Sequence, residues 1–134
     1  FIGNPPMNFL DGKIIKLANA YYFQDKNFRV KILEHTYDRV SKFVEKPVVL
    51  GIRPENIYDR LFAQAASDEF TVTATVEVVE PMGSEIYLHL STGHNGFIAR
   101  VNAHDTAKEN QDLQLVFDMT KAHFFDVETE ASIV

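Results

Sequence analysis

The sequence predicts an all-β domain, mainly antiparallel, that closes into a barrel or sandwich and carries one helix. Apolar residues alternate with Thr and Glu from Phe70 to Val78, which is the period of a strand with one buried face. Other short apolar runs are separated by Gly, Pro, Asn and Asp, as in small β proteins. We count about seven or eight such strands without repeats, and closure hides the edges of such a sheet. The 134 residues suffice for one core.

Residues 1–10, FIGNPPMNFL, predict an extended connector. Two adjacent prolines disfavour both a helix interior and a central strand. Because Phe1 is not an initiator methionine, we interpret the chain as a segment of a longer protein.

Two short strands and a helix are expected next. The Asp11-Gly12 pair is typical of a turn, and the apolar segments 13–17 and 21–23 follow it as strands. Apolar residues then recur at the spacing of an amphipathic helix, which we place over about residues 31–45. This apolar stripe consists of Leu33, Tyr37, Val40 and Val44.

The centre of the chain predicts a buried strand. The run 47–52, PVVLGI, is short and apolar and stops at Arg53-Pro54, as a strand does on leaving a core. Residues 57–69 are expected to form an ordered connector or a short helical turn.

The clearest strand begins at Phe70 and opens a hairpin. Its alternation breaks at residues 80–84 and resumes at Ile86, so the two arms are expected to pair as antiparallel neighbours.

The last third of the chain predicts three more strands. Gly, Asn and Ser make residues 91–96 a turn, and a strand follows at 97–101. Residues 102–111 are polar and predict a surface loop, while 113–117 and 122–127 predict the final strands.

Charge and composition exclude several function classes. The net charge of −6 argues against a nucleic-acid partner, because Lys and Arg drive that binding. The absence of cysteine excludes a disulfide framework, a thiolate metal site and a cysteine nucleophile. No apolar stretch approaches the roughly 20 residues of a membrane span, so we expect a cytoplasmic protein without direct membrane insertion.

No residue pattern predicts catalysis or a bound metal. A triad drawn from Ser84, His89 and Asp105 lacks a nucleophile-elbow motif. His89 alternates with Leu88 and Leu90 and is expected on the surface. The histidines also lack metal-ligand spacing, and these are His89, His94, His104 and His123. The glycines form no phosphate-binding loop, so we expect no cofactor in this segment.

Four strings occur in one order: FIG-x-P-x-MNF at 1–9, GIRPE at 51–55, VVEPMGSE at 78–85 and AHFFDVET at 122–129. Together, over nearly the whole chain, they resemble the C-terminal domain of the ATP-binding subunit of carbohydrate ABC importers, the family of the maltose-transporter ATPase. The resemblance implies a transport-associated, OB-like barrel over residues 11–134. It also implies that residues 1–10 connect to a nucleotide-binding domain, where ATP and Mg would bind.

The resemblance further implies a non-catalytic regulatory and dimerisation role. The partners it implies are a twin subunit, the membrane subunits of a sugar transporter through the parent chain, and in some members a regulatory protein. Such a subunit is cytoplasmic and peripheral to the inner face of the membrane. The residues that match family motifs are Gly51, Arg53, Pro54, Glu55, Gly83, Phe125 and Asp126. We interpret these as fold elements or interface residues, with Arg53 and Glu55 as internal or intersubunit ion-pair partners.

A second function stays open at this point. Related transport-associated domains of oxyanion importers are similar in fold and bind molybdate between paired barrels. Ser84, Ser91 and Thr92 lie near predicted turns and offer hydroxyl donors for such an oxyanion.

Overall fold

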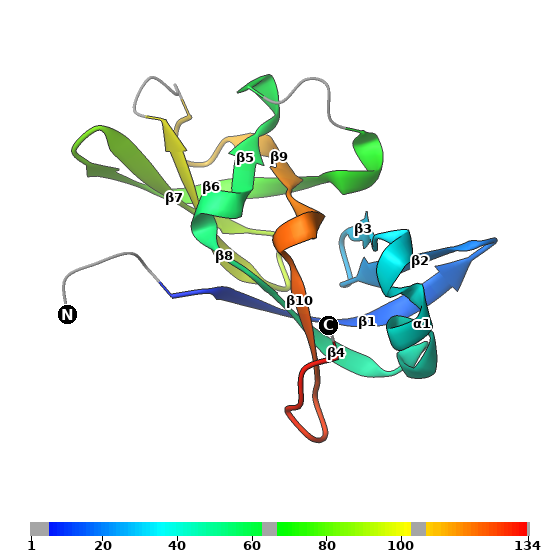
Figure 1. The fold of residues 1–134 in the computed structure, drawn as a ribbon. Helices are drawn as coiled ribbons and strands as arrows, with labels where there is room; N and C mark the ends of the chain where they lie inside the picture. Colours follow the sequence, from blue (N-terminus) through cyan, green and yellow to red (C-terminus); the bar gives the residue numbers. More distant parts are fainter. Residues whose placement is uncertain (1–5, 63–66, 103–106, 134) are drawn as a thin grey trace.

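The computed structural model describes residues 6–62, 67–102 and 107–133, in which ten strands form two five-stranded sheets (Figure 1). His104 and Asp105, considered above as a metal ligand and a triad member, lie outside the described residues. Every pair of neighbouring strands in these sheets is antiparallel. The predicted all-β, mainly antiparallel fold class is therefore confirmed.

The first sheet has the strand order β10-β4-β1-β2-β3. Its strands are β1 (Asn8–Leu17), β2 (Ala20–Gln24), β3 (Arg29–Lys31), β4 (Pro47–Ile52) and β10 (His123–Asp126). β4 lies between β10 and β1, and its inward side chains are buried, as its apolar run predicts.

The second sheet has the order β5-β9-β6-β7-β8. Its strands are β5 (Ile57–Asp59), β6 (Thr71–Met82), β7 (Glu85–Ser91), β8 (Gly96–Asn102) and β9 (Asp112–Phe117). β5 and β8, at the two ends of this order, lie close together, so the sheet is a nearly closed barrel.

One hydrophobic core joins the two sheets. Its largest fully buried side chains come from both, and they include Leu10, Ile14, Phe23, Leu50, Ile57, Leu88, Leu115 and Phe117. Since each sheet buries its apolar face against the other, the two form a single folding unit. In the described residues, no helix has the length and apolarity that a membrane span requires.

The helical segment is shorter than the helix expected over residues 31–45. β3 occupies its start, and α1 (Tyr37–Val40) is a single turn between two 3-10 turns, Glu34–Thr36 and Ser41–Phe43. The apolar stripe does face the core, because Val40 is fully buried. Pairing with β2 extends the first sheet into this segment, which the helical spacing does not reveal.

The turn predicted at Asp11-Gly12 is wrong, because both residues lie inside β1. A Cβ on Gly12 would lie 2.5 Å from the carbonyl oxygen of Gln24 and 2.6 Å from the Phe23 ring. Glycine here permits a close approach within the sheet. The predicted connector likewise ends early, since residues 8–10 belong to β1.

The predicted hairpin is confirmed with a shorter turn. β6 and β7 pair as far as Met82, which leaves only Gly83-Ser84 between them. A β-bulge between Val76 and Val78 shifts the register. Val78, which the alternation places in the core, is therefore 48% exposed.

Residues 57–69 contain a strand that the sequence pattern missed. β5 has three residues and is followed by the 3-10 turn Arg60–Phe62, while Phe70 ends another such turn, Asp68–Phe70. Strands of three residues carry too little alternation to be recognised. β8, β9 and β10 agree with the strands predicted at 97–101, 113–117 and 122–127.

Two buried asparagines bind β1 to β8. Asn8 of β1 donates from Nδ2 to the Ile98 carbonyl at 2.8 Å, and its Oδ1 accepts from the Ile98 N–H at 2.8 Å. Asn95, just before β8, donates to the Asp11 carbonyl of β1 and accepts from the Asp11 N–H, both at 2.9 Å. Each side-chain amide thus donates to and accepts from the backbone of one residue, as a neighbouring strand would. One amide reaches from β1 to β8 and the other from the residue before β8 to β1, so the two contacts are reciprocal.

The carboxylate of Asp25 completes this polar link between the sheets. It is 5% exposed and accepts from the N–H groups of Asn27 and Phe28 at 2.6 and 2.9 Å. Its other oxygen accepts from the Thr92 hydroxyl at 2.9 Å and from Asn95 Nδ2 at 3.0 Å. Four donors make burial of this charge tolerable.

We expect Asn95→Ala to lower the free energy of unfolding by about 2–3 kcal/mol, because the Asp11 peptide and the Asp25 carboxylate both lose buried partners. Urea unfolding followed by circular dichroism measures this change. The control is Asn19→Ala in the exposed β1–β2 turn, which should stay within about 0.5 kcal/mol of the parent. Equal losses in the two variants would contradict the bridging role.

Candidate interaction surface

The outer face of the first sheet brings several motif residues together. The strand registers place six residues of β1, β4 and β10 in two rows across this face. One row is Phe9, Gly51 and His123, and the next is Asp11, Val49 and Phe125.

Gly51 makes room for aromatic rings on this face. A Cβ at this position would lie 2.7 Å from Met7 Sδ and 3.0 Å from a ring carbon of Phe125. The Phe9 and Phe125 rings meet edge to face, with their centroids 6.1 Å apart, a favoured aromatic geometry. The glycine of the GIRPE string is therefore required for packing.

These residues form an exposed apolar surface, which we call the β4 patch: Phe9, Val49, Phe125 and Val127. Phe9 is 59% exposed and Val127 is 46% exposed. The patch lies in a depression of about 550 Å³ that is also lined by Asp11, Asp126 and Glu130. An apolar centre with a charged margin is typical of a protein–protein contact.

Arg53 extends the β4 patch at one end. It is exposed and extended, two residues beyond Gly51, so it emerges on the same face. Pro54 is buried at the start of the 3-10 turn Pro54–Asn56, and Glu55 is half-buried. Among the described residues neither Arg53 nor Glu55 forms a salt bridge, so the internal ion pair is not found.

The remaining motif residues have different surroundings. Gly83 lies apart, in the β6–β7 turn, with a φ of 72° that favours glycine and open space around it. Asp126 lies beside the β4 patch, where its Oδ2 accepts a hydrogen bond from the Thr129 hydroxyl at 2.9 Å. That bond shapes the turn after β10.

Charge is unevenly distributed along the chain. Residues 11–46 contain eight of the 13 Lys and Arg residues but only five of the 19 acidic residues. Residues 47–134 therefore contain five basic and 14 acidic residues.

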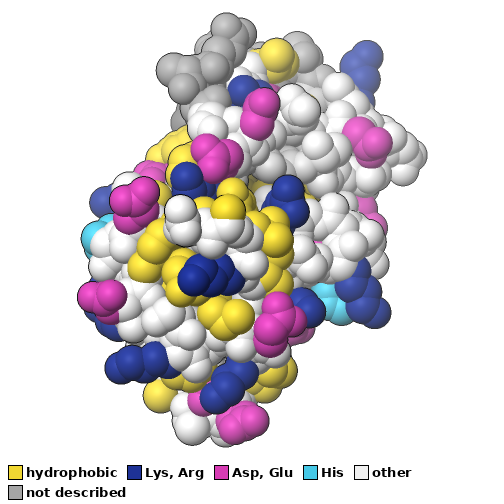
Figure 2. Space-filling model, turned by 90° about the vertical axis from the view of Figure 1, so that its right-hand side faces the viewer, with side chains coloured by type: hydrophobic (Ala, Val, Ile, Leu, Met, Phe, Trp, Pro, Cys, Tyr) yellow, Lys and Arg dark blue, Asp and Glu magenta, His cyan; other side chains and the backbone are white. Residues whose placement is uncertain are grey.

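Figure 2 shows the side of the molecule formed by α1 and β2, where Lys and Arg lie over hydrophobic side chains. Lys16 Nζ, for example, is 5.6 Å from the Tyr21 ring centroid, within the cation–π range.

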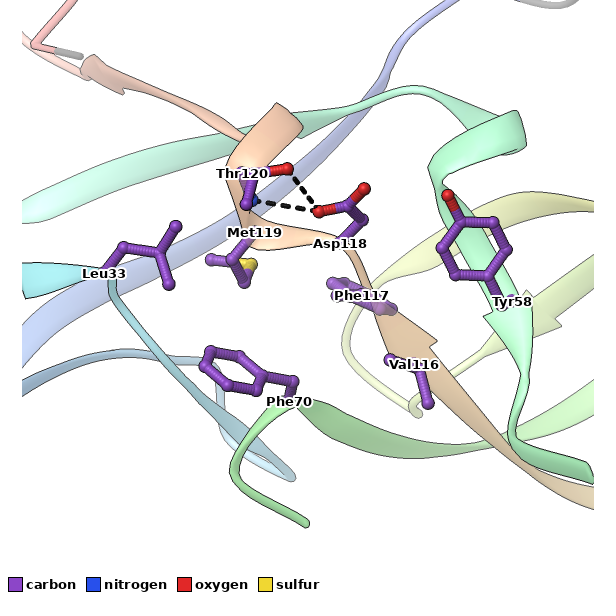
Figure 3. Close-up of a pocket in the computed structure, with 8 residues that line it drawn as sticks. All are labelled: Leu33, Tyr58, Phe70, Val116, Phe117, Asp118, Met119 and Thr120. Atoms are coloured by element: carbon purple, nitrogen blue, oxygen red, sulfur yellow. Dashed lines mark hydrogen bonds between the residues drawn. The ribbon is translucent and has the colours of Figure 1, made fainter. Parts of the chain in front are cut away.

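A second candidate site is an apolar pocket of about 290 Å³ (Figure 3). It lies where the segment before α1 meets β5, β9 and the turn before β6. Its lining residues are Leu33, Tyr58, Phe70, Val116, Phe117, Asp118, Met119 and Thr120. Sequence reasoning missed this pocket because its residues come from four segments that are separated in the sequence, and no pattern within a segment indicates that folding brings them together.

Asp118 supplies the carboxylate of this pocket. Its Oδ1 accepts from the Thr120 N–H at 3.1 Å and from the Thr120 hydroxyl at 2.5 Å, and so caps the 3-10 turn Met119–Lys121. Partial burial, and then the negative charge of Asp118, raise the pKa of Tyr58 above its usual value, because both disfavour the phenolate.

The described residues bring together no catalytic or metal-binding group. His89 lies on the outer face of β7, as predicted, with Nε2 3.0 Å from Glu80 Oε1 on β6. Ser84 is exposed in the β6–β7 turn, away from it along the strand. The described ranges contain no cluster of three His, Cys, Asp or Glu side chains fit to hold a metal ion.

The donors considered for an oxyanion do not converge. Ser84 lies at one end of the seven-residue strand β7, and Ser91 and Thr92 lie at the other, about 20 Å away. The Thr92 hydroxyl already donates to the Asp25 carboxylate, whose charge would repel an anion. This arrangement does not favour an oxyanion site on these three residues.

Two family models match the chain. The MalK OB fold domain matches residues 3–57, and the TOBE domain matches residues 50–125. The OB-like, transport-associated fold expected from the motifs is therefore confirmed.

Curated relatives align with nearly the whole of this chain. The chain is 38% identical over 136 residues to the trehalose/maltose import ATP-binding protein MalK of Thermococcus litoralis, and 36% identical over 137 residues to the oligosaccharides import ATP-binding protein MsmX of Bacillus subtilis. Each alignment covers 99% of this chain and 36% of the relative. The chain thus spans about a third of the length of these relatives.

A solved structure confirms the fold by shape. The cytoplasmic molybdate-binding protein ModG superimposes with a TM-score of 0.64 over 87% of this chain and 94% of that chain, at 11% identity.

We expect Tyr58 to ionise at higher pH than an ordinary tyrosine, whose pKa is about 10. The pKa of Tyr58 is measured by following absorbance at 295 nm as pH rises and subtracting the titration curve of the Tyr58→Phe variant. Because Tyr58 binds its proton more tightly in the folded state than in the unfolded state, the protonated phenol adds to the free energy of unfolding. This contribution is complete below the unfolded pKa and is lost as pH rises through the folded pKa. Asp118→Asn should move the titration only part of the way back, since partial burial remains. Titration of Tyr58 at the ordinary pH would contradict this environment.

Proposed function

Because this chain belongs to the TOBE domain family, we propose that it is the C-terminal regulatory domain of the ATP-binding subunit of a carbohydrate ABC importer, and that it holds two such subunits together. The observation that carries this proposal is the match of 99% of the chain to proteins named as sugar-import ATP-binding proteins. The domain itself performs no chemistry in this proposal.

The β4 patch supplies the contact between the two subunits. Arg53, which forms no salt bridge within the described part of the chain, lies at one end of its apolar centre, and Asp11 and Asp126 lie at the other. A twofold axis along the row of Phe9, Gly51 and His123 would bring Arg53 of one subunit beside Asp11 of the second, and the apolar centres against each other. A surface of this kind complements itself, as a twofold dimer requires.

A standing contact between these domains helps the catalytic cycle of the parent protein. ATP and Mg would bind to its nucleotide-binding domains, and the membrane subunits of the transporter would bind the parent chain at the inner face of the membrane. A dimer contact between these domains would keep the two nucleotide-binding domains close together after they separate. Their effective concentration would stay high, so they could close again without a new bimolecular encounter.

The chain alone should not hydrolyse ATP, because the described residues assemble no phosphate-binding loop or catalytic base. Release of inorganic phosphate from MgATP by the purified chain measures this. Turnover that a substitution within the chain abolishes would contradict the non-catalytic role.

The chain should self-associate through the β4 patch. Phe9→Ser should weaken the dimer about tenfold or more, because an exposed phenyl ring loses its apolar contact. Sedimentation velocity across a concentration series measures the association. Met82→Ser removes another exposed apolar side chain, at the β6–β7 turn, and should leave the dimer unchanged.

Charge exchange tests the twofold arrangement. Arg53→Glu and Asp11→Lys should each weaken the dimer about tenfold, since each change alters two symmetric rim pairs. The double variant restores opposite charges and should recover most of the affinity. A parent chain that stays monomeric at high micromolar concentration, or a double variant weaker than both single ones, would refute this contact.

A further inference from the structure

The pocket of Figure 3 has the chemistry of a peptide-anchoring site. We propose that it receives a bulky apolar side chain of a partner protein, and that a Lys or Arg beside that side chain pairs with Asp118. This binding site is additional to the subunit contact and does not depend on it, because none of its lining residues belongs to the β4 patch.

The size and lining of the pocket suit a single anchor residue. About 290 Å³ accommodates one large side chain, and apolar groups of Leu33, Phe70, Val116 and Met119 surround it. Tyr58 forms an open rim, 40% exposed. A free small ligand would leave much of its surface in water there, whereas a peptide also covers the rim around its anchor.

Asp118 favours a basic neighbour for that anchor. Thr120 fixes one oxygen of its carboxylate, and within the described ranges it forms no salt bridge. Lys121 is the cation nearest in sequence to Asp118, but it is exposed and forms no salt bridge with Asp118 among the described residues. Lys31 and Arg60 are engaged in the pairs Lys31–Glu69 and Arg60–Asp68. A positioned carboxylate without a cation binds an ammonium or guanidinium through charge-assisted hydrogen bonds.

The long-range field acts in the same direction. Seven of the eight lining residues belong to residues 47–134, the part of the chain with five basic and 14 acidic residues. Such an excess attracts a basic segment and repels an acidic one. Charge complementarity therefore selects a basic peptide over an acidic one with the same anchor.

A tryptophan peptide provides a direct test, because the chain contains no tryptophan and the emission reports only on the peptide. The probe is acetylated, amidated Lys-Lys-Trp-Lys-Lys, titrated with the full 134-residue chain. We expect saturable binding with a blue shift of the emission. Asp118→Asn should weaken it about fivefold, since asparagine keeps the cap and loses the charge.

The matched control is Asp112→Asn, which removes one exposed carboxylate at the start of β9, the strand that ends just before Asp118. This variant should leave affinity within about twofold of the parent. The peptide Glu-Glu-Trp-Glu-Glu should not bind. Absent binding of the basic peptide, equal binding of both peptides, or equal effects of the two substitutions would overturn the proposal. Benzylammonium binding as tightly as the basic peptide would also overturn it, by indicating a small-molecule site.

Sedimentation of the same samples separates this result from the subunit contact. Loss of self-association with peptide binding intact refutes only the dimer role. Loss of peptide binding with the dimer intact refutes only the anchoring site.

Discussion

The reciprocal amide clamp between β1 and β8 is the constraint on which the rest of the structure depends. Asn8 and Asn95 each satisfy one peptide group of the opposite strand, and Asp25 ties Asn95 to Thr92. A hydrophobic core alone has no direction, but paired amide contacts hold the two strands in one alignment. They therefore fix how the open first sheet sits against the barrel.

The positions of the two candidate binding surfaces follow from the way the two sheets pack together. Because the inward faces of both sheets are buried in one core, the two candidate binding surfaces lie on the outer face of the first sheet and where the sheets meet. The β4 patch occupies the first place, where Gly51 lets Phe9 and Phe125 pack together. The pocket beside Asp118 occupies the second.

Alternation and turn residues were sufficient to predict the fold class, the β6–β7 hairpin and the strands of the last third. These patterns gave wrong predictions where a residue type is explained by a contact with a distant segment and not by its local conformation. Gly12 reads as a turn but serves a close contact with β2, and a bulge after Val76 reverses the face of Val78. The motif residues Gly51 and Phe125 proved to be neighbours, while Gly83 lies apart. Tyr58 and Asp118 carry no local signal, because only folding brings them to one pocket.

Covalent trapping at the β4 patch tests the central claim, that this fold serves to bring two subunits face to face. The chain has no cysteine, so a single His123→Cys variant reports on one exposed position in the row of the proposed axis. Under mild oxidation we predict a disulfide-linked dimer of His123→Cys at concentrations where Met82→Cys stays monomeric. Equal cross-linking of the two variants, or none at His123→Cys, would contradict the account.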